Sequence, residues 1–234
     1  MPSITDAANH VLAAGVPVLF LDTCSILDVI RAPARNLANC VEAATELLAL
    51  ATVSPAQCSL IVGSFVPTEW SDHEQEVLDL LNGHLQRMED QARHFHGLCT
   101  HLGIPLAFGQ PQYGASGLVP RLHDLSRQIL RASIALDSHD DTMSRAYNRV
   151  AITRRRPCRR GGELKDCTIF EECLEVCRQL HGGGFTRKMV FCSSNTDDYC
   201  APGVTPHPDV ANDCGAVGLV FTTSLPWAVH ELKT

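Results

Sequence analysis

Short apolar runs alternate with stretches of helical periodicity in this chain, and that alternation limits the folds open to it. The runs lie at 18–21, 59–63, 189–192 and 217–221. Strands that alternate with helices are typical of parallel sheets joined by crossover helices. We therefore predict an α/β fold, a three-layer α/β/α domain with Rossmann-like topology. Four strands of its central parallel sheet can be assigned from the sequence, and the chain is long enough for a fifth.

Helical periodicity fills the segments between these runs. Helices are predicted at 5–14, 25–31, 36–50, 166–180 and 225–232, and a loop at 193–208. Thr5 is the expected cap of the first helix.

The segment 68–149 reads as almost wholly helical. Its first part has an apolar stripe that we expect to be buried, formed by Trp70, Val77, Leu80, Leu81, Leu85 and Met88. A second helical segment runs from 119 to 136, after a loop rich in proline and glycine. Because a crossover needs only about a dozen residues, we predict a helical insertion at about 70–150, a candidate lid or substrate clamp, within a single domain spanning 1–234.

The cysteine content and the net charge restrict the cellular compartment and the binding partners that the sequence favours. The 234 residues contain eleven cysteines, an odd number scattered through predicted strands and helices, which favours reduced thiols in a cytoplasmic protein. Gly15 and Pro17 interrupt the only apolar stretch near the start, which argues against a secretory signal. No run approaches the ~20 apolar residues of a membrane span. A net charge of -7 argues against nonspecific coating of nucleic acid.

Four acidic residues lie where strands end or helices begin: Asp22, Glu69, Asp166 and Asp198. Each has an ordinary structural explanation, as a helix cap, a turn residue or a partner of the helix dipole. Together they predict something more specific, because sites in open α/β sheets gather beyond the carboxyl ends of the strands. Converged carboxylates there would form a site for a hard divalent cation.

The order of these residues resembles the PIN domain family of metal-dependent nucleases. Four short motifs match the family pattern in sequence, at 21–25, 67–69, 165–169 and 191–199, and 218–221 matches its closing strand. Each motif is weak alone, and four in the right order are fairly specific. The resemblance covers most of 18–225 apart from the helical block.

The resemblance implies a metal-dependent endoribonuclease that uses Mg²⁺ or Mn²⁺, which prefer oxygen ligands. The implied catalytic and metal-binding residues are Asp22, Glu69, Asp166 and Asp198, with Thr23, Ser194 and Asn195 around them. Many family members have an aspartate where Asn195 or Thr196 stands here, so the fourth carboxylate is Asp198 or Asp197, and the lost charge implies weaker metal binding or a single metal.

The family includes toxins, processing factors and defence effectors, and the sequence does not choose among them. RNA is the expected substrate, DNA is the alternative nucleic acid, and a second copy or an inhibitory protein is the expected protein partner. The leading alternative function is a catalytically weak PIN fold that serves as an RNA-binding or assembly module.

Five arginines precede the predicted helix at 166: Arg154, Arg155, Arg156, Arg159 and Arg160. They form either a phosphate-contacting loop beside the acidic cluster or a solvated arm that pairs with acidic neighbours.

Two further groups have weaker functional interpretations. His94, His96, His101 and Cys99 are dense enough to suggest zinc, but residues two apart on a helix point to different faces. Cys173 and Cys177 share an apolar helix face and are expected to be buried.

Overall fold

The centre of the fold is a sheet of five parallel strands in the order β3-β2-β1-β4-β5. The computed structural model describes residues 1–107, 109, 111–157 and 164–234. The strands are β1 (Val18–Leu21), β2 (Ser59–Val62), β3 (Ile134–Ala135), β4 (Met189–Cys192) and β5 (Leu219–Thr222). The three central strands are buried throughout, while β3 and β5 at the edges are partly exposed. The predicted α/β class with a parallel central sheet is confirmed.

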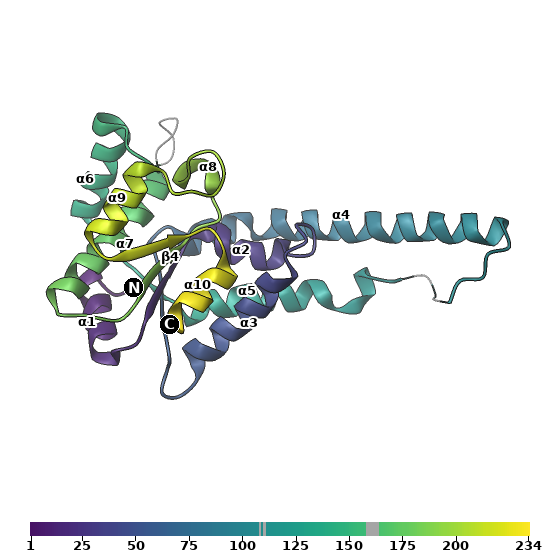
Figure 1. Cartoon of the computed structure of the whole chain (residues 1–234), viewed down its shortest axis with the longest axis horizontal. Helices are drawn as coiled ribbons and strands as arrows, with labels where there is room; N and C mark the ends of the chain where they lie inside the picture. Colours follow the sequence, from purple (N-terminus) through teal and green to yellow (C-terminus); the bar gives the residue numbers. More distant parts are fainter. Residues whose placement is uncertain (108, 110, 158–163) are drawn as a thin grey trace.

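Helices cover both faces of the sheet (Figure 1). One layer contains α1 (Ile4–Ala14), α6 (Asp140–Tyr147) and α7 (Leu164–Gly182), which pack on one another. The other contains α2 (Thr23–Arg31), α3 (Ala38–Thr52), α5 (Leu118–Ala132) and α10 (Leu225–Leu232). The short α8 (Thr196–Tyr199) follows β4, and α9 (Pro208–Ala216) packs against β5. Within the described ranges, no helix combines the length and apolar character needed to cross a membrane.

The helical block is an arm that projects from the body rather than a cap over the sheet (Figure 1). Its main element, α4, runs for 36 residues from Val66 to His101, and α5 returns beside the half nearest the body. Leu81 and Leu85 are buried there, but Leu80 is 58% and Met88 36% exposed. The expectation that Leu80 and Met88 are buried was therefore wrong. Leu80 lies about 100° around the helix from the buried Leu81, so the two side chains are on different faces.

Other local expectations need correction. The loop expected at 193–208 contains the short helix α8. Ser3, not Thr5, caps α1, in a reciprocal capping box with Asp6. The segment predicted as helix to 136 stops at Ala132, and Ile134–Ala135 forms the fifth strand, paired with Ile61–Val62. The helix Pro208–Ala216 was missed; His207 caps it through the amide of Asp209, and Pro208 occupies its first turn.

Gly63, directly after β2, is required by the close approach of α7. A Cβ there would lie 2.8 Å from a carboxylate oxygen of Glu172 and 3.2 Å from the backbone of Ile169. Glu172 is fully buried and accepts from the amide and hydroxyl of Ser64 at 2.8 and 2.6 Å. Burial raises the pKa of Glu172, and the two Ser64 bonds oppose that shift. These contacts fix the first half of α7 against the end of β2.

Candidate active site at the carboxyl edge of the sheet

Asp22 lies at the centre of the candidate site, immediately after β1. Its side chain is buried at 2% exposure. One carboxylate oxygen, Oδ1, accepts from the amide of Thr23 at 2.8 Å and so caps α2. The other, Oδ2, accepts from the hydroxyl of Ser193 at 2.6 Å and from Cys24 Sγ at 3.1 Å. Asp22 therefore has the ordinary capping role and also points an oxygen at the end of β4.

The pKa of Asp22 is raised above its ordinary value. Burial is the largest cause, and the charge of Asp198 adds to it, while the bonds from Ser193, Cys24 and Thr23 oppose it. No lysine, arginine or histidine of the described chain forms an ion pair with Asp22. A buried carboxylate beside a second carboxylate is expected to take up a cation or a proton.

Thr23 links Asp22 to Glu69 across the site. Its hydroxyl donates to Oε2 of Glu69 at 2.7 Å, and its amide donates to Asp22. Glu69 lies in the first turn of α4, the end of the arm that joins the body. The ammonium of Lys165 lies 3.8 Å from the other oxygen of Glu69. A cation supplied by the chain itself is thus already close to this carboxylate.

Tyr199 connects the two remaining acidic positions. It is fully buried, and its hydroxyl donates to the carbonyl oxygen of Asp166 at 3.3 Å. Its pKa is raised well above the ordinary value by burial first, and then by the charges of Asp22 and Asp166. Both carboxylates therefore act on the same hydroxyl, which places Asp166 at this edge of the sheet. Asp166 lies in the first turn of α7.

Asp198 is held by Asn195 within the short helix α8. The Asn195 amide nitrogen donates to Oδ2 of Asp198 at 2.8 Å, and Oδ1 of Asn195 caps the amide of Asp198 at 3.4 Å. Asn195 thus uses its side chain to orient the carboxylate that follows it. Its carbonyl oxygen is engaged in this cap, which limits its availability as a metal ligand.

The four predicted acidic residues lie at one edge of the sheet, but they do not form a closed cage. Within the described ranges, no three His, Cys, Asp or Glu side chains are close enough to hold a metal ion. This applies equally to the histidine group on α4, so the zinc alternative has no geometric support. The donor chemistry of the edge still suits Mg²⁺ or Mn²⁺, because the available atoms are carboxylate oxygens.

Ser193, Cys24, Tyr199 and Lys165 contact the predicted residues and were not predicted themselves. Ser193, rather than Ser194, bonds to Asp22, since the register pairs Leu21 with Cys192 and so aligns the residues that follow. The amide of Ser194 instead donates to the hydroxyl of Ser25 at 3.1 Å. A sequence signal existed in the hydroxyl residues after β4, but the choice between them depends on strand register.

The arginine segment is tied to acidic neighbours. Arg155 bonds to Asp213 at 2.8 Å and lies 3.8 Å from Asp209, both on α9. Arg156 donates to the carbonyl oxygens of Asp197 and Asp198, at 2.8 and 3.4 Å. The alternative of pairing with acidic neighbours therefore holds for Arg155. Arg159 and Arg160 lie outside the described residues.

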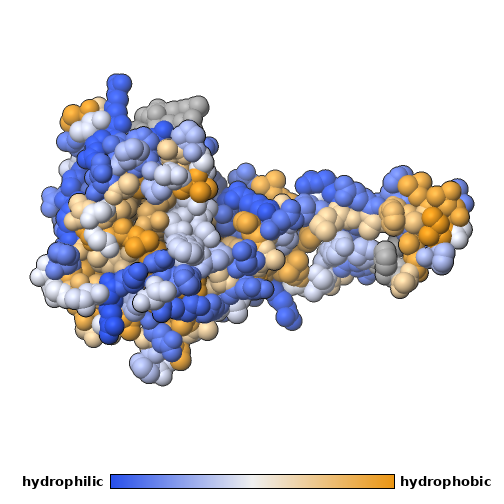
Figure 2. Space-filling view, in the orientation of Figure 1, coloured by the Kyte–Doolittle hydropathy of each residue, from blue (hydrophilic) through white to orange (hydrophobic). Residues whose placement is uncertain are grey.

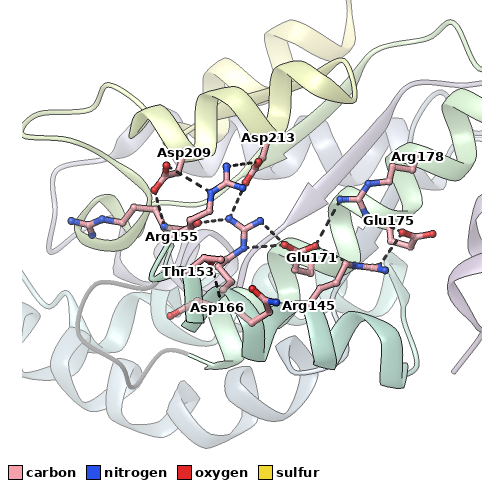
Figure 3. Close-up of polar contacts among 12 residues, drawn as sticks. Arg145, Thr153, Arg155, Asp166, Glu171, Glu175, Arg178, Asp209 and Asp213 are labelled. Atoms are coloured by element: carbon pink, nitrogen blue, oxygen red, sulfur yellow. Dashed lines mark hydrogen bonds and ion pairs between the residues drawn. The ribbon is translucent and has the colours of Figure 1, made fainter. Parts of the chain in front are cut away.

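Arg149 anchors this segment through its side chain, and its role was not predicted. Its guanidinium bonds to Glu171 of α7, to Asp213 of α9 at 2.8 Å and to the carbonyl oxygen of Arg156 at 2.6 Å. Figure 3 shows Glu171, Arg155 and Asp213 within one polar network. It also lies 5.2 Å over the ring of Phe170. Burial alone would lower the pKa of Arg149, but its carboxylate partners more than offset that effect and raise it. The network fixes the arginine segment between α7 and α9.

Among the described residues, Arg154 takes part in no ion pair. It is exposed and adopts a left-handed backbone conformation with φ 50°. Arg155 and Arg156 are both partly buried, so Arg154 is the exposed arginine among the described ones of this segment.

Comparison of the chain with protein-family models, with curated proteins and with solved structures finds no match in any of the three.

Proposed function

We propose that this protein is a metal-dependent endoribonuclease of the PIN type, with its active site at the carboxyl edge of the sheet. The observation that carries the proposal is Asp22, a buried carboxylate with a raised pKa, next to Asp198 and without a cationic partner in the described chain. Such a group is costly to keep charged unless a cation completes the site.

Asp22, Asp166 and Asp198 would hold Mg²⁺ or Mn²⁺, and Glu69 would complete the set or orient a water. Bound there, the cation would activate water and offset the charge that develops on the scissile phosphate. Ser193 and Thr23 fix the Asp22 carboxylate, and Thr23 also fixes Glu69. Asn195 fixes Asp198. The chain itself thus contributes by holding the carboxylate oxygens of Asp22, Glu69 and Asp198 in fixed orientations.

RNA would reach this edge past Arg154 and Lys165. The overall charge of -7 disfavours polyanion binding, so local positive charge has to supply it. DNA remains the alternative substrate class. A cytoplasmic location is part of the same proposal and is supported by the free cysteines of the described chain.

A second candidate function is a catalytically weak fold of the same type that binds RNA or assembles with a partner. It is favoured by the lack of a three-ligand metal group in the described ranges and by the proximity of Lys165 to Glu69. In that case the ammonium would stand where an active nuclease has a metal.

One experiment separates the two functions. Purified protein is incubated with mixed structured RNA in Mg²⁺ or Mn²⁺, with a chelator as control, alongside Asp22→Asn and Asp166→Asn. The proposal predicts divalent-dependent cleavage that falls by orders of magnitude in both variants, because each loses a charged ligand at constant volume.

Asp28→Asn is the matched control. Asp28 lies on α2, the helix that Asp22 caps, and its carboxylate is also buried. Unlike Asp22, Asp28 is paired with an arginine, Arg35. RNA binding without cleavage by the wild type would favour the second function. Near-wild-type cleavage by Asp22→Asn at matched metal concentration would overturn the proposed site.

A further inference from the structure

The outer part of the arm carries an apolar stripe that is largely exposed in the described structure. Four side chains on or next to α4 form this outer stripe: Met88, Phe95, Leu98 and Leu102. Their exposed fractions are 36, 54, 51 and 73%. Figure 2 shows hydrophobic residues gathered at the far end of the arm. Contiguous exposed apolar surface of this kind marks an interaction site.

The spacing of the outer stripe is that of a helix–helix seam. Met88, Phe95 and Leu102 are seven residues apart, and Leu98 follows Phe95 by three. At about 100° per residue the four lie within an arc of about 80° on one face. Apolar residues at the first and fourth positions of a heptad are the pattern by which one helix packs along another. A helix with matching spacing would fit this stripe.

Nearer the body the adjoining face of α4 is already used in this way. Leu81 and Leu85 are buried where α5 runs beside α4. Beyond them, α4 faces the segment between its own end and Leu118, where η1 (Gly114–Ser116) is the described helix. The outer stripe thus continues a helix-packing face past the end of its internal partner.

The charges of the outer arm permit a second copy to approach. Between residues 87 and 101 there are two arginines and two carboxylates, so the net charge is zero with neutral histidines. Arg93 is paired with Asp90 at 2.9 Å, and Glu89 accepts from the amide of Gly114 at 2.8 Å. Three of the four charged side chains thus have partners within the chain, and a helix of zero net charge would not repel an identical one.

We propose that the outer stripe binds the same stripe of a second copy of this chain, forming a two-fold dimer through the arms. A two-fold interface uses the same patch on both subunits, which an apolar stripe of zero net charge satisfies. The arms run antiparallel, because the body is much wider than the arm and parallel arms would force the bodies together (Figure 1). In this arrangement Phe95 of each copy packs on Leu98 of the other. The dimer is independent of the nuclease function.

The mass of the protein in solution, measured by light scattering and sedimentation across a dilution series, tests this dimer. The wild type should reach twice the chain mass of 25.5 kDa. The double variant Phe95→Glu, Leu98→Glu should raise the dimer dissociation constant by about a hundredfold or more, because it puts like charges into the seam. Thr100→Glu adds a charge about 160° away from the stripe on the same helix, and it should leave the mass unchanged.

A mixing experiment separates loss of the interface from loss of folding. The double variant Phe95→Lys, Leu98→Lys should be monomeric alone, and it should form a 1:1 heterodimer with the Phe95→Glu, Leu98→Glu variant. A wild type that stays monomeric at every concentration would overturn the dimer and leave the arm to a different partner. Dimers that persist in the glutamate variant, or a mixture that fails to associate, would overturn the proposed seam.

Discussion

The hydroxyl of Ser193 donates to Oδ2 of Asp22 at 2.6 Å, which joins the residue after β4 to the residue after β1. Both side chains are buried, Ser193 completely. A bond from a neutral donor to a carboxylate favours the charged form. Ser193 therefore works against the burial that raises the pKa of Asp22.

Removing this donor should weaken both the fold and the site. Ser193→Ala should lower the free energy of unfolding at neutral pH by about 2 kcal/mol, the typical value for a hydrogen bond to a charged group. It should also raise the pKa of Asp22, so the acidic limb of the pH–rate profile for RNA cleavage should move to higher pH. Chemical denaturation and cleavage rates across pH measure the two effects.

Ser194→Ala is the control for that variant, because the hydroxyl that donates to Asp22 belongs to Ser193, whereas the Ser194 amide donates to Ser25. It should leave the acidic limb in place. If Ser194→Ala moved the limb as far as Ser193→Ala, the hydrogen bond to Asp22 would not be the cause.

The raised pKa of Asp22 predicts an unusual dependence of stability on pH. Below its ordinary value of 3.8 the carboxyl is protonated in both the folded and unfolded chain. Between that value and the raised pKa, the folded protein keeps a proton that the unfolded chain releases, so the contribution of Asp22 to stability falls as pH rises. Above the raised pKa, the carboxylate is charged in both states, and its burial destabilises the folded protein by the full amount.

In a chelating buffer, Asp22→Asn should therefore be more stable than the wild type at neutral pH, and the difference should shrink as pH falls towards 3.8. Denaturant midpoints across pH measure it. Asp28→Asn should behave oppositely at neutral pH, because it leaves Arg35 without the carboxylate that now lies 2.6 Å away. A stability difference for Asp22→Asn that is independent of pH would contradict the assignment.

Metal binding should stabilise the folded protein. A cation that binds only the folded state shifts unfolding by mass action, and here it would also relieve repulsion between Asp22 and Asp198. The melting temperature should rise when Mn²⁺ is added to chelator-treated protein. The gain should vanish in the double variant Asp22→Asn, Asp166→Asn. An equal rise in both proteins would place the metal elsewhere.

Continuous apolar runs made the three buried strands predictable. The central strands β1, β2 and β4 are buried along their whole length, so nearly every residue in them is hydrophobic. Their ends located Asp22 as well, because a polar residue must appear where a buried strand reaches the edge. The edge strand β3 has only two residues, both partly exposed, and its sequence continues the apolar periodicity of α5. Pairing with β2, a long-range contact, decides its conformation.

The details of the site depended on contacts that a sequence does not record. Register between β1 and β4 selects Ser193 over Ser194 as the partner of Asp22. The sequence indicated Arg149 only as the end of the predicted helical segment. In the structure it is buried between α7 and α9 and anchors the arginine segment. Such choices follow from tertiary packing, which local patterns do not specify.

The arginine segment should divide into one residue that binds RNA and one that stabilises the fold. Arg154 is exposed and forms no ion pair within the described chain, so Arg154→Gln should weaken RNA binding and lower the slope of log affinity against log salt by about one unit. Arg155 is engaged with Asp213 at 2.8 Å and with Asp209. Arg155→Gln should therefore leave the salt slope nearly unchanged and lower the unfolding free energy by about 1 kcal/mol or less, since the pair is partly exposed. Filter binding at several salt concentrations and denaturant unfolding of both variants measure the division. Equal salt slopes for the wild type and Arg154→Gln would show that this segment is a structural brace alone, and that RNA approaches the acidic edge by another path.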